Sequence, residues 1–211
     1  MPSEDIVPDI VHVIDDDEAV RQSLEFLLKS ADIGVRTYES AVAFLEELDE
    51  KTSGCLVTDV RMPQMSGLEL LQRVRKTHPD LPVIVITGHG DVSLAVEAMK
   101  AGAADFLEKP FDDEALLGAV RDAFGRKGSG DGRDAERREL ARRIEALSGR
   151  ERQVLEGLVA GHPNKIIAFD LGISPRTVEI YRANLMTKMQ AASLSDLVRM
   201  ALIAGLLPDR L

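Results

Sequence analysis

The sequence predicts an α/β domain, a doubly wound five-stranded parallel sheet, followed by a small all-α four-helix domain. Three observations indicate this arrangement. Short apolar segments alternate with helical patterns over residues 1–124, whereas from Ser148 onward the apolar spacing is helical throughout. Strands that alternate with helices form parallel sheets covered by helices on both faces. Between the two parts, residues 125–134 contain four glycines in ten residues, which marks a domain boundary.

Five strand–helix units are expected in the first part. The first helix shows the pattern clearly, because Val20, Leu24, Leu27 and Leu28 fall on one helical face. Strands are predicted at 9–15, 34–40, 55–60, 82–88 and 105–110, and helices at 18–31, 41–50, 66–78, 91–103 and 112–125.

The segment 125–147 is expected to be a partly helical linker between domains 1–124 and 148–211. Its second half is highly charged, and Leu140, Ile144 and Leu147 form one narrow apolar stripe. This pattern is typical of a solvated linker helix. A short coiled coil or a helix that docks on a neighbouring domain is the alternative.

The charge is distributed unevenly between the two parts. Residues 1–124 hold 11 Lys and Arg against 25 Asp and Glu, a net charge of −14, whereas residues 125–211 hold 15 against 11, a net charge of +4. Opposite net charges on the two parts indicate that they have different partners. The positively charged C-terminal part could bind nucleic acid. No stretch approaches the roughly 20 apolar residues of a membrane helix, and the single Cys55 excludes an internal disulfide framework. The expected location is the cytoplasm.

Polar side chains stand at the carboxyl ends of the predicted strands, where open α/β sheets bind ligands. They are Asp15, Asp16 and Asp17 after the first strand, Asp59 at the end of the third, Thr87 at the end of the fourth, and Lys109 at the end of the fifth. Clustered carboxylates repel one another and need a cation, and Mg²⁺ suits such oxygen ligands. Asp59 is the candidate nucleophile that would form an acyl phosphate, with Thr87 and Lys109 on the phosphoryl oxygens.

The motifs VIDDDEAVR, LVTDVRMPQMSGLELL and VIVITGHGDVSLAVEAMKAGAADFLEKPF occur in order over residues 9–124. This part resembles the receiver domain of response regulators. The resemblance implies Asp59 as phospho-acceptor, Asp15 and Asp16 as Mg²⁺ ligands with the backbone carbonyl of Arg61, Thr87 and Phe106 as switch residues, Lys109 as the phosphate-binding residue, and a cis peptide bond before Pro110. Two features depart from it: the third acid, Asp17, makes the metal assignment ambiguous by one position, and Phe106 lacks a hydroxyl group.

The C-terminal part contains two helical segments separated by LGIS. Gly172 fits a tight turn, Ser174 is a strong N-cap, and Pro175 occupies a favoured first helical position. Val178, Leu185 and Met189 form an inward stripe on the second segment, whose other face is polar: Arg176, Thr177, Glu179, Arg182, Asn184 and Lys188. This pattern predicts a helix-turn-helix whose second helix enters the major groove of DNA.

Residues 148–205 resemble the LuxR-type (NarL/FixJ) helix-turn-helix domain, most closely in SPRTVEIYRANLMTKM. The resemblance implies contacts to base edges from Glu179, Ile180, Arg182 and Ala183, and places Lys165, Arg176, Thr177, Tyr181 and Lys188 near phosphates. Tyr181 stands where the family often has histidine. The last helix, in 193–206, is either a dimerisation surface, as in family members, or part of the core.

Together the two parts resemble a two-component response regulator of the FixJ/NarL family. We therefore expect a transcriptional regulator, not an enzyme beyond self-catalysed phosphoryl acceptance and slow autodephosphorylation. Its expected partners are a sensor histidine kinase, promoter double-stranded DNA, a second copy of the phosphorylated chain and, as a further candidate, RNA polymerase; no membrane partner is expected. The receiver would dimerise on phosphorylation.

Two alternatives come from other classes. A phosphatase with an aspartyl nucleophile would usually carry a second acid two residues after it, and here that residue is Arg61. A DNA-binding protein with a vestigial receiver would not be expected to keep the intact set of Asp15, Asp16, Asp59, Thr87 and Lys109.

Overall fold

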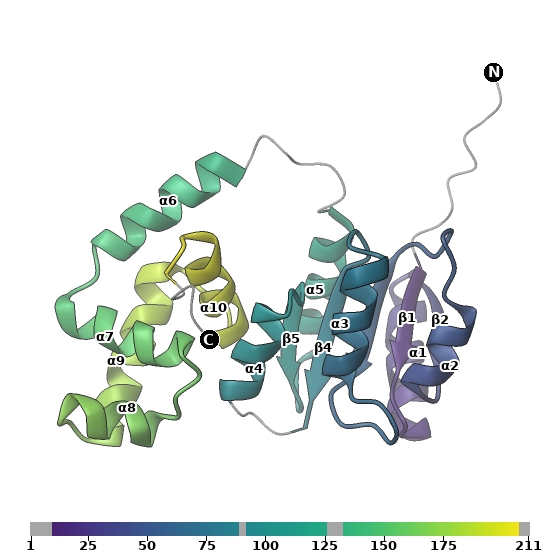
Figure 1. Cartoon of the computed structure of the whole chain (residues 1–211), viewed down its shortest axis with the longest axis horizontal. Helices are drawn as coiled ribbons and strands as arrows, with labels where there is room; N and C mark the ends of the chain where they lie inside the picture. Colours follow the sequence, from purple (N-terminus) through teal and green to yellow (C-terminus); the bar gives the residue numbers. More distant parts are fainter. Residues whose placement is uncertain (1–9, 89–91, 126–132, 207–211) are drawn as a thin grey trace. The chain divides into compact units, whose positions relative to one another are not determined.

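The computed structural model describes residues 10–88, 92–125 and 133–206 (Figure 1). The chain divides into two compact units. The first unit contains the β-sheet, and the second contains the C-terminal helices. Helix α4 (Val92–Lys100) is grouped with the second unit, although the sequence places it among the alternating elements of the first part.

All five strands are parallel and pair in the order β2-β1-β3-β4-β5. Each strand lies within the range that the sequence predicts and is shorter by one or more residues. Their bounds are β1 (Ile10–Ile14), β2 (Gly34–Tyr38), β3 (Cys55–Asp59), β4 (Val83–Thr87) and β5 (Asp105–Glu108). Nearly every residue of β3 and β4 is buried, as expected for central strands covered on both faces.

Four helices of the first unit cover the sheet: α1 (Glu18–Ser30), α2 (Ala41–Glu47), α3 (Gly67–Thr77) and α5 (Asp113–Gly125). Leu24 and Leu28 of α1 and Leu116 and Val120 of α5 share one core with alternate residues of the strands. Helices α2 and α3 lie in front of the sheet in Figure 1. The prediction of a doubly wound α/β domain is therefore confirmed.

The register of the strands brings the predicted functional residues to one edge of the sheet. Asp59 at the end of β3 pairs with Ile86, one residue before Thr87 at the end of β4. Thr87 in turn pairs with Glu108 of β5, directly before Lys109. Parallel strands thus carry these chain segments to the same carboxyl edge.

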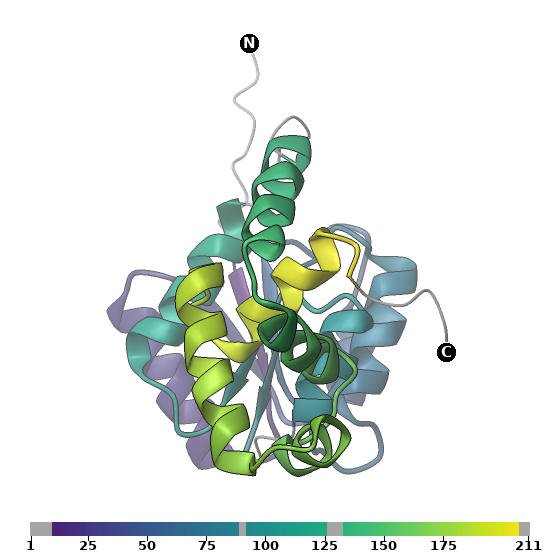
Figure 2. The same cartoon turned by 90° about the vertical axis from the view of Figure 1, so that its left-hand side faces the viewer.

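In its described residues the second unit contains five further helices, coloured green to yellow in Figure 2. They are α6 (Arg133–Glu145), α7 (Gly149–Val159), α8 (Asn164–Leu171), α9 (Pro175–Met189) and α10 (Leu194–Ile203). None of the helices in the described ranges is long and apolar enough to cross a membrane.

Helix α6 packs on the other C-terminal helices. Leu140, Ile144 and Leu147 are buried in the same core as the apolar residues of α7, α9 and α10. The guanidinium of Arg143 also donates to the carbonyl of Met189 at the end of α9, at 2.9 Å. Of the two interpretations of this stripe, docking on a neighbouring domain describes the structure. Residues 126–132 of the predicted linker lie outside the described ranges.

The turn between α8 and α9 has the predicted chemistry. Gly172 adopts a left-handed conformation with φ of 65°, which costs glycine little. The Ser174 side chain accepts a hydrogen bond from the backbone of Thr177, and Pro175 begins α9. The inward stripe of α9 is confirmed, because Val178, Leu185 and Met189 are fully buried.

Candidate functional site

One ammonium group joins two carboxylates at the carboxyl edge of the sheet. Lys109 Nζ lies 2.9 Å from Asp15 Oδ2 and 3.0 Å from Asp59 Oδ1. The Asp15 and Asp59 side chains are 5% and 12% exposed, so their mutual repulsion is only weakly screened by water. The shared cation offsets that repulsion. The structure thus brings together three of the residues predicted to form the site.

The pKa of Lys109 reflects this position. Burial alone lowers it, but hydrogen bonds to Asp15 and Asp59 and the charges of both carboxylates outweigh burial and raise the pKa above its ordinary value. Lys109 is therefore a fixed positive charge at neutral pH. A fixed cation at this point can also meet the oxygens of an incoming phosphoryl group.

Backbone amides hold the remaining carboxylate oxygens in place. Asp15 Oδ1 accepts from the backbone of Asp17 at 2.9 Å, and Asp59 Oδ2 accepts from the backbone of Arg61 at 2.6 Å. Each carboxylate therefore has one oxygen on an amide and the other on Lys109. Such a preorganised carboxylate keeps one orientation before any ligand arrives.

The third acid of the triplet has a structural role. Asp17 caps α1, because its side chain accepts hydrogen bonds from the backbones of Ala19 and Val20. Asp16 is exposed beside it. The sequence carried a signal for this cap, since Asp17 directly precedes the helical pattern.

The donor set suits a hard divalent cation. Carboxylate and carbonyl oxygens are the ligands that Mg²⁺ prefers, and Asp15 and Asp59 already face a common positive charge. Within the described residues, however, no group of three or more His, Cys, Asp or Glu side chains is arranged to hold a metal ion. In this arrangement Lys109 supplies the cation between the two acids.

The predicted switch residues lie on the two neighbouring strands. Thr87 is 1% exposed at the end of β4, and its carbonyl accepts from the backbone of Lys109 at 2.7 Å. Phe106 on β5 is 6% exposed and pairs with Val85. The peptide bond between Lys109 and Pro110 is cis, as expected. The switch roles of Thr87 and Phe106 stay predictions.

Gly67 allows α3 to start directly against the end of β3. A Cβ atom at this position would lie 2.1 Å from the carbonyl oxygen of Asp59, far inside contact distance. The Gly67 amide donates to the carbonyl of Val60 at 2.9 Å, which ties the helix start to the loop after Asp59. This glycine is a site-positioning residue that the sequence reasoning did not single out.

The predicted DNA-contacting residues occupy different environments on α8 and α9. Those exposed to solvent are Lys165, Arg176, Glu179, Ile180, Ala183 and Lys188. Thr177 is half-buried, and its hydroxyl lies 2.8 Å from that of Ser174. Tyr181 is half-buried and packs against the core of the second unit. A groove-facing role is thus compatible with the exposed set, while Tyr181 contributes to packing.

Two of the predicted DNA-contacting residues have partners within the protein. Arg182 Nη1 donates to Asn164 Oδ1 at the start of α8, at 3.0 Å. Lys188 Nζ lies 2.7 Å from Glu151 Oε2 on α7, and Glu151 is only 4% exposed. The sequence reasoning missed both partners. Glu151 carried one signal, because Ser148 and Glu151 form a capping box at the start of α7.

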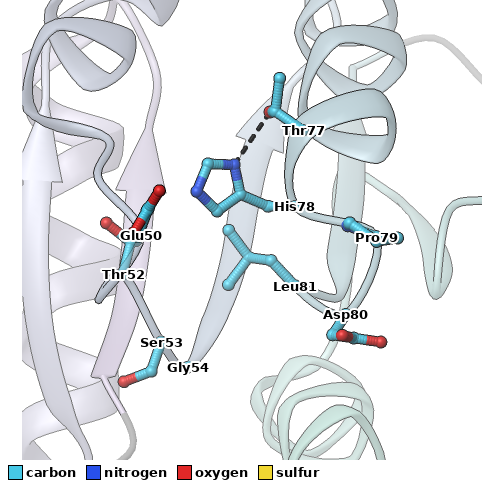
Figure 3. Close-up of a pocket in the computed structure, with 9 residues that line it drawn as sticks. All are labelled: Glu50, Thr52, Ser53, Gly54, Thr77, His78, Pro79, Asp80 and Leu81. Carbon is cyan, nitrogen blue, oxygen red and sulfur yellow. Dashed lines mark hydrogen bonds between the residues drawn. The ribbon is translucent and has the colours of Figure 1, made fainter.

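A cavity lies elsewhere in the first unit, away from the acidic site. A cavity of about 580 Å³ opens beside the amino end of β3, between the loop before that strand and the loop after α3 (Figure 3). His78 points into it, with Nδ1 2.9 Å from the Thr77 hydroxyl. The lining contains neither Asp15 nor Asp59. Cavity size therefore does not locate the acidic site.

Both halves of the chain match known families. The family of response regulator receiver domains matches residues 11–121, and the luxR family of bacterial regulatory proteins matches residues 145–201.

Relatives named as transcriptional regulatory proteins match nearly the whole chain. The transcriptional regulatory protein FixJ of Azorhizobium caulinodans is 62% identical, over 94% of this chain and 94% of its own length. FixJ of Bradyrhizobium diazoefficiens is 53% identical, over 94% and 97%. The crystal structure of full-length FixJ from B. japonicum is 52% identical and covers 95% of this chain and 98% of its own, with a TM-score of 0.55.

Proposed function

The chain belongs to the family of response regulators that join a receiver domain to a LuxR-type DNA-binding domain, and we propose that Asp59 is the phospho-acceptor of this phosphorylation-activated transcription regulator. The observation that carries the assignment is the contact of one ammonium, that of Lys109, with both Asp59 and Asp15. Asp59 is the acid that ends the central strand β3. Its side chain is partly accessible, as a nucleophile must be.

The proposed reaction is the transfer of one phosphoryl group to Asp59. An Asp59 carboxylate oxygen attacks the phosphorus of a phosphohistidine on a sensor kinase; the O–P bond forms as the P–N bond breaks, and the histidine leaves. Lys109 neutralises the charge of the phosphoryl oxygens, and the Thr87 hydroxyl is proposed to contact one of them. Asp15 and Asp59 with the carbonyl of Arg61 would hold Mg²⁺ once the exposed Asp16 turns toward them, and the ion would supply further charge neutralisation. Slow hydrolysis of the acyl phosphate would reset the protein.

A groove beside the acidic site supports docking of the kinase there. It has a volume of about 350 Å³ and lies between α1 and the segment after β5. Its lining is mostly apolar: Ala19, Val20, Ser23, Leu24, Leu27, Lys109, Pro110, Phe111 and Asp113. Phe26, one helical turn beyond Ser23, is 75% exposed. Lys109 belongs to both the groove and the site, so a partner in the groove would lie next to Asp59.

The proposed output is paired binding to promoter DNA. Phosphorylation shifts the population of the receiver toward a form that dimerises through Thr87- and Phe106-linked changes. Two helix-turn-helix domains then reach two half-sites in successive major grooves.

Domain limits of 1–124 for the receiver and 148–211 for the DNA-binding domain accompany this proposal, with RNA polymerase as a further candidate partner. Promoter binding would place the protein in the cytoplasm. The chain is a response regulator rather than a classical enzyme.

The test is the mass of the protein in solution, measured by light scattering with and without beryllofluoride and Mg²⁺. Wild type should change from monomer to dimer, and Asp59→Ala should remain monomeric. Asp80→Ala removes an exposed acid in the segment between α3 and β4, at the opposite end of β4 from the site, and serves as the matched control, which should behave as wild type. Dimerisation of Asp59→Ala on the same treatment would contradict the assignment.

A further inference from the structure

Arg182 in the middle of α9 is bound to the helix before it. Its Nη1 donates to Asn164 Oδ1 at 3.0 Å, and the contact is partly buried. The family resemblance assigns Arg182 to a base edge, where an arginine can read guanine. We propose instead that Arg182 is a positioning residue, which fixes the recognition helix α9 against α8 through Asn164. The inference rests on the proposed binding of DNA by this domain.

The bond is placed where it can set the angle between the two helices. Asn164 is the first residue of α8, and the Gly172 turn follows the last residue, so the turn and the bond tie α8 to α9 at opposite ends. The bond at Asn164 and the turn at Gly172 lie at the two ends of the eight-residue helix α8, about 12 Å apart along its axis. The buried residues Val178, Leu185 and Met189 hold α9 against the core of the second unit, and the bond adds a directional constraint on the angle at which α9 crosses α8.

Arg182 is less exposed to solvent than the other residues of α9 that are predicted to contact bases. Glu179, Ile180 and Ala183 are exposed, and Ile180 is 57% exposed although it is apolar. Arg182 is half-buried, with its guanidinium turned toward α8. A side chain that reads guanine must carry two parallel N–H groups into the groove, to O6 and N7. Breaking the bond to Asn164 for that purpose would remove the second tie just when α9 docks.

A residue that positions α9 and a residue that contacts a base edge affect DNA binding differently, because only the second affects the preference for particular base pairs. Loss of a reader relaxes the preference at one base pair, whereas a displaced helix weakens binding to every sequence. They also differ in their dependence on Asn164. If Arg182 acts through Asn164, removal of either side chain has the same effect, and removal of both adds nothing further.

The experiment uses the full chain treated with beryllofluoride and Mg²⁺. Duplexes are selected from a random library with the wild-type protein, and the Kd is measured for the selected duplex and for all its single-base-pair variants. The proteins compared are wild type, Arg182→Ala, Asn164→Ala and the double variant. Arg176→Ala is the matched control, an exposed arginine on the same helix with a predicted phosphate contact.

Arg182→Ala and Asn164→Ala should each weaken binding to every duplex by the same factor, about tenfold for a hydrogen bond to a charged group. The double variant should lose no more than either single one. The pair Asn164→Asp with Arg182→Lys rebuilds a cross-helix contact and should regain most of the affinity, which a merely destabilising change would not allow. Arg176→Ala should reduce the slope of log Kd against log salt concentration by about one, the contribution of one phosphate contact. Arg182→Ala should leave that slope unchanged.

Loss of discrimination at one G·C pair in Arg182→Ala, with that discrimination kept in Asn164→Ala, would overturn the positioning role and restore the reading role. Multiplying losses in the double variant, or wild-type affinity in both single variants, would also overturn it. Failure of the library to enrich any duplex with the wild-type protein would overturn the DNA-binding function itself, a separate result.

Discussion

The ammonium of Lys109 lies 3.0 Å from a carboxylate oxygen of Asp59, although 50 residues separate them in the chain. The contact depends on the sheet, because each residue stands at the carboxyl end of its strand and β4 lies between the two strands. It keeps a positive charge in place beside the acid before any phosphoryl group arrives. The sheet therefore assembles the acidic site from segments that lie far apart in the sequence.

Lys109→Met should slow phosphorylation of Asp59 by about 100-fold, the order expected when one preorganised charge is removed from a transition state. The measurement is the rate of acyl phosphate formation from acetyl phosphate and Mg²⁺, followed on phosphate-affinity gels. Lys76→Met removes an exposed lysine of α3 and should leave the rate unchanged. An unaltered rate in Lys109→Met would remove this residue from the proposed reaction.

Gly67→Ala should destabilise the fold by roughly 1–3 kcal/mol, the usual cost of overpacking, and should also slow phosphorylation. The added Cβ would lie 2.1 Å from the Asp59 carbonyl oxygen, so the end of β3 or the start of α3 must shift. Urea unfolding and the same phosphorylation assay measure the two effects.

Gly118→Ala is the control, since a Cβ there meets nothing within 4 Å in the interior of α5. It should stabilise the protein by up to about 1 kcal/mol. Equal stability of the two alanine variants would contradict the close approach at Gly67.

The fold and the acidic site were largely predictable because they depend on local patterns. Alternating apolar segments set the strands, and the parallel arrangement then requires Asp15, Asp59 and Lys109 to meet at one edge. The role of Asp17 as a helix cap was also signalled by its position directly before the helical pattern, although the run of three acids left open which of them binds the metal.

The cross-helix contacts of the second unit could not be predicted in the same way. Lys188 and Glu151 are 37 residues apart, and Arg182 and Asn164 are 18 apart. All four are residue types that usually face solvent, so no pattern of burial indicates which pairs meet. The apolar stripe of α6 was visible, but the surface that covers it could be identified only from the packing.

His12 should titrate below pH 6.5, and the folded protein should lose stability as the pH falls below that value. Its ring is 5% exposed on β1; burial lowers its pKa, and the charge of Arg36 lowers it further, against opposing effects of the Ser53 carbonyl and Glu47. The unfolded chain then binds a proton that the folded chain resists. The stabilising effect is complete above 6.5 and declines as the pH falls toward the lowered pKa.

NMR of the histidine ring protons measures this pKa, with the His12→Gln spectrum identifying the signal. The unfolding free energy of His12→Gln should depend less on pH below 6.5 than that of wild type. His162→Gln removes the ring signal of an exposed histidine of the second unit and serves as the control for the assignment. A midpoint above 6.5 for His12 would contradict the prediction.

Glu151→Gln should lower the unfolding free energy of the second unit by roughly 1–3 kcal/mol at neutral pH, the range for a hydrogen bond to a charged group. The hydrogen bond from Lys188, together with the backbone and hydroxyl of Ser148, lowers the pKa of Glu151 from 4.5 to about 2. Glutamine keeps an oxygen that can accept from Ser148 but loses the charge that faces Lys188. Because α7 and α9 would lose their ion pair, the affinity for DNA should fall as well.

The pH dependence distinguishes this ion pair from simple packing. A carboxylate whose pKa is lowered stabilises the fold fully above its unfolded value of 4.5, and that effect is lost as the pH falls toward about 2. The difference in unfolding free energy between wild type and Glu151→Gln should therefore shrink across this interval. Glu156→Gln, on the exposed side of the same helix, should leave the unfolding free energy at neutral pH close to that of wild type. A difference that stays constant with pH would show that Glu151 acts through its shape rather than its charge, because only the charged form attracts Lys188.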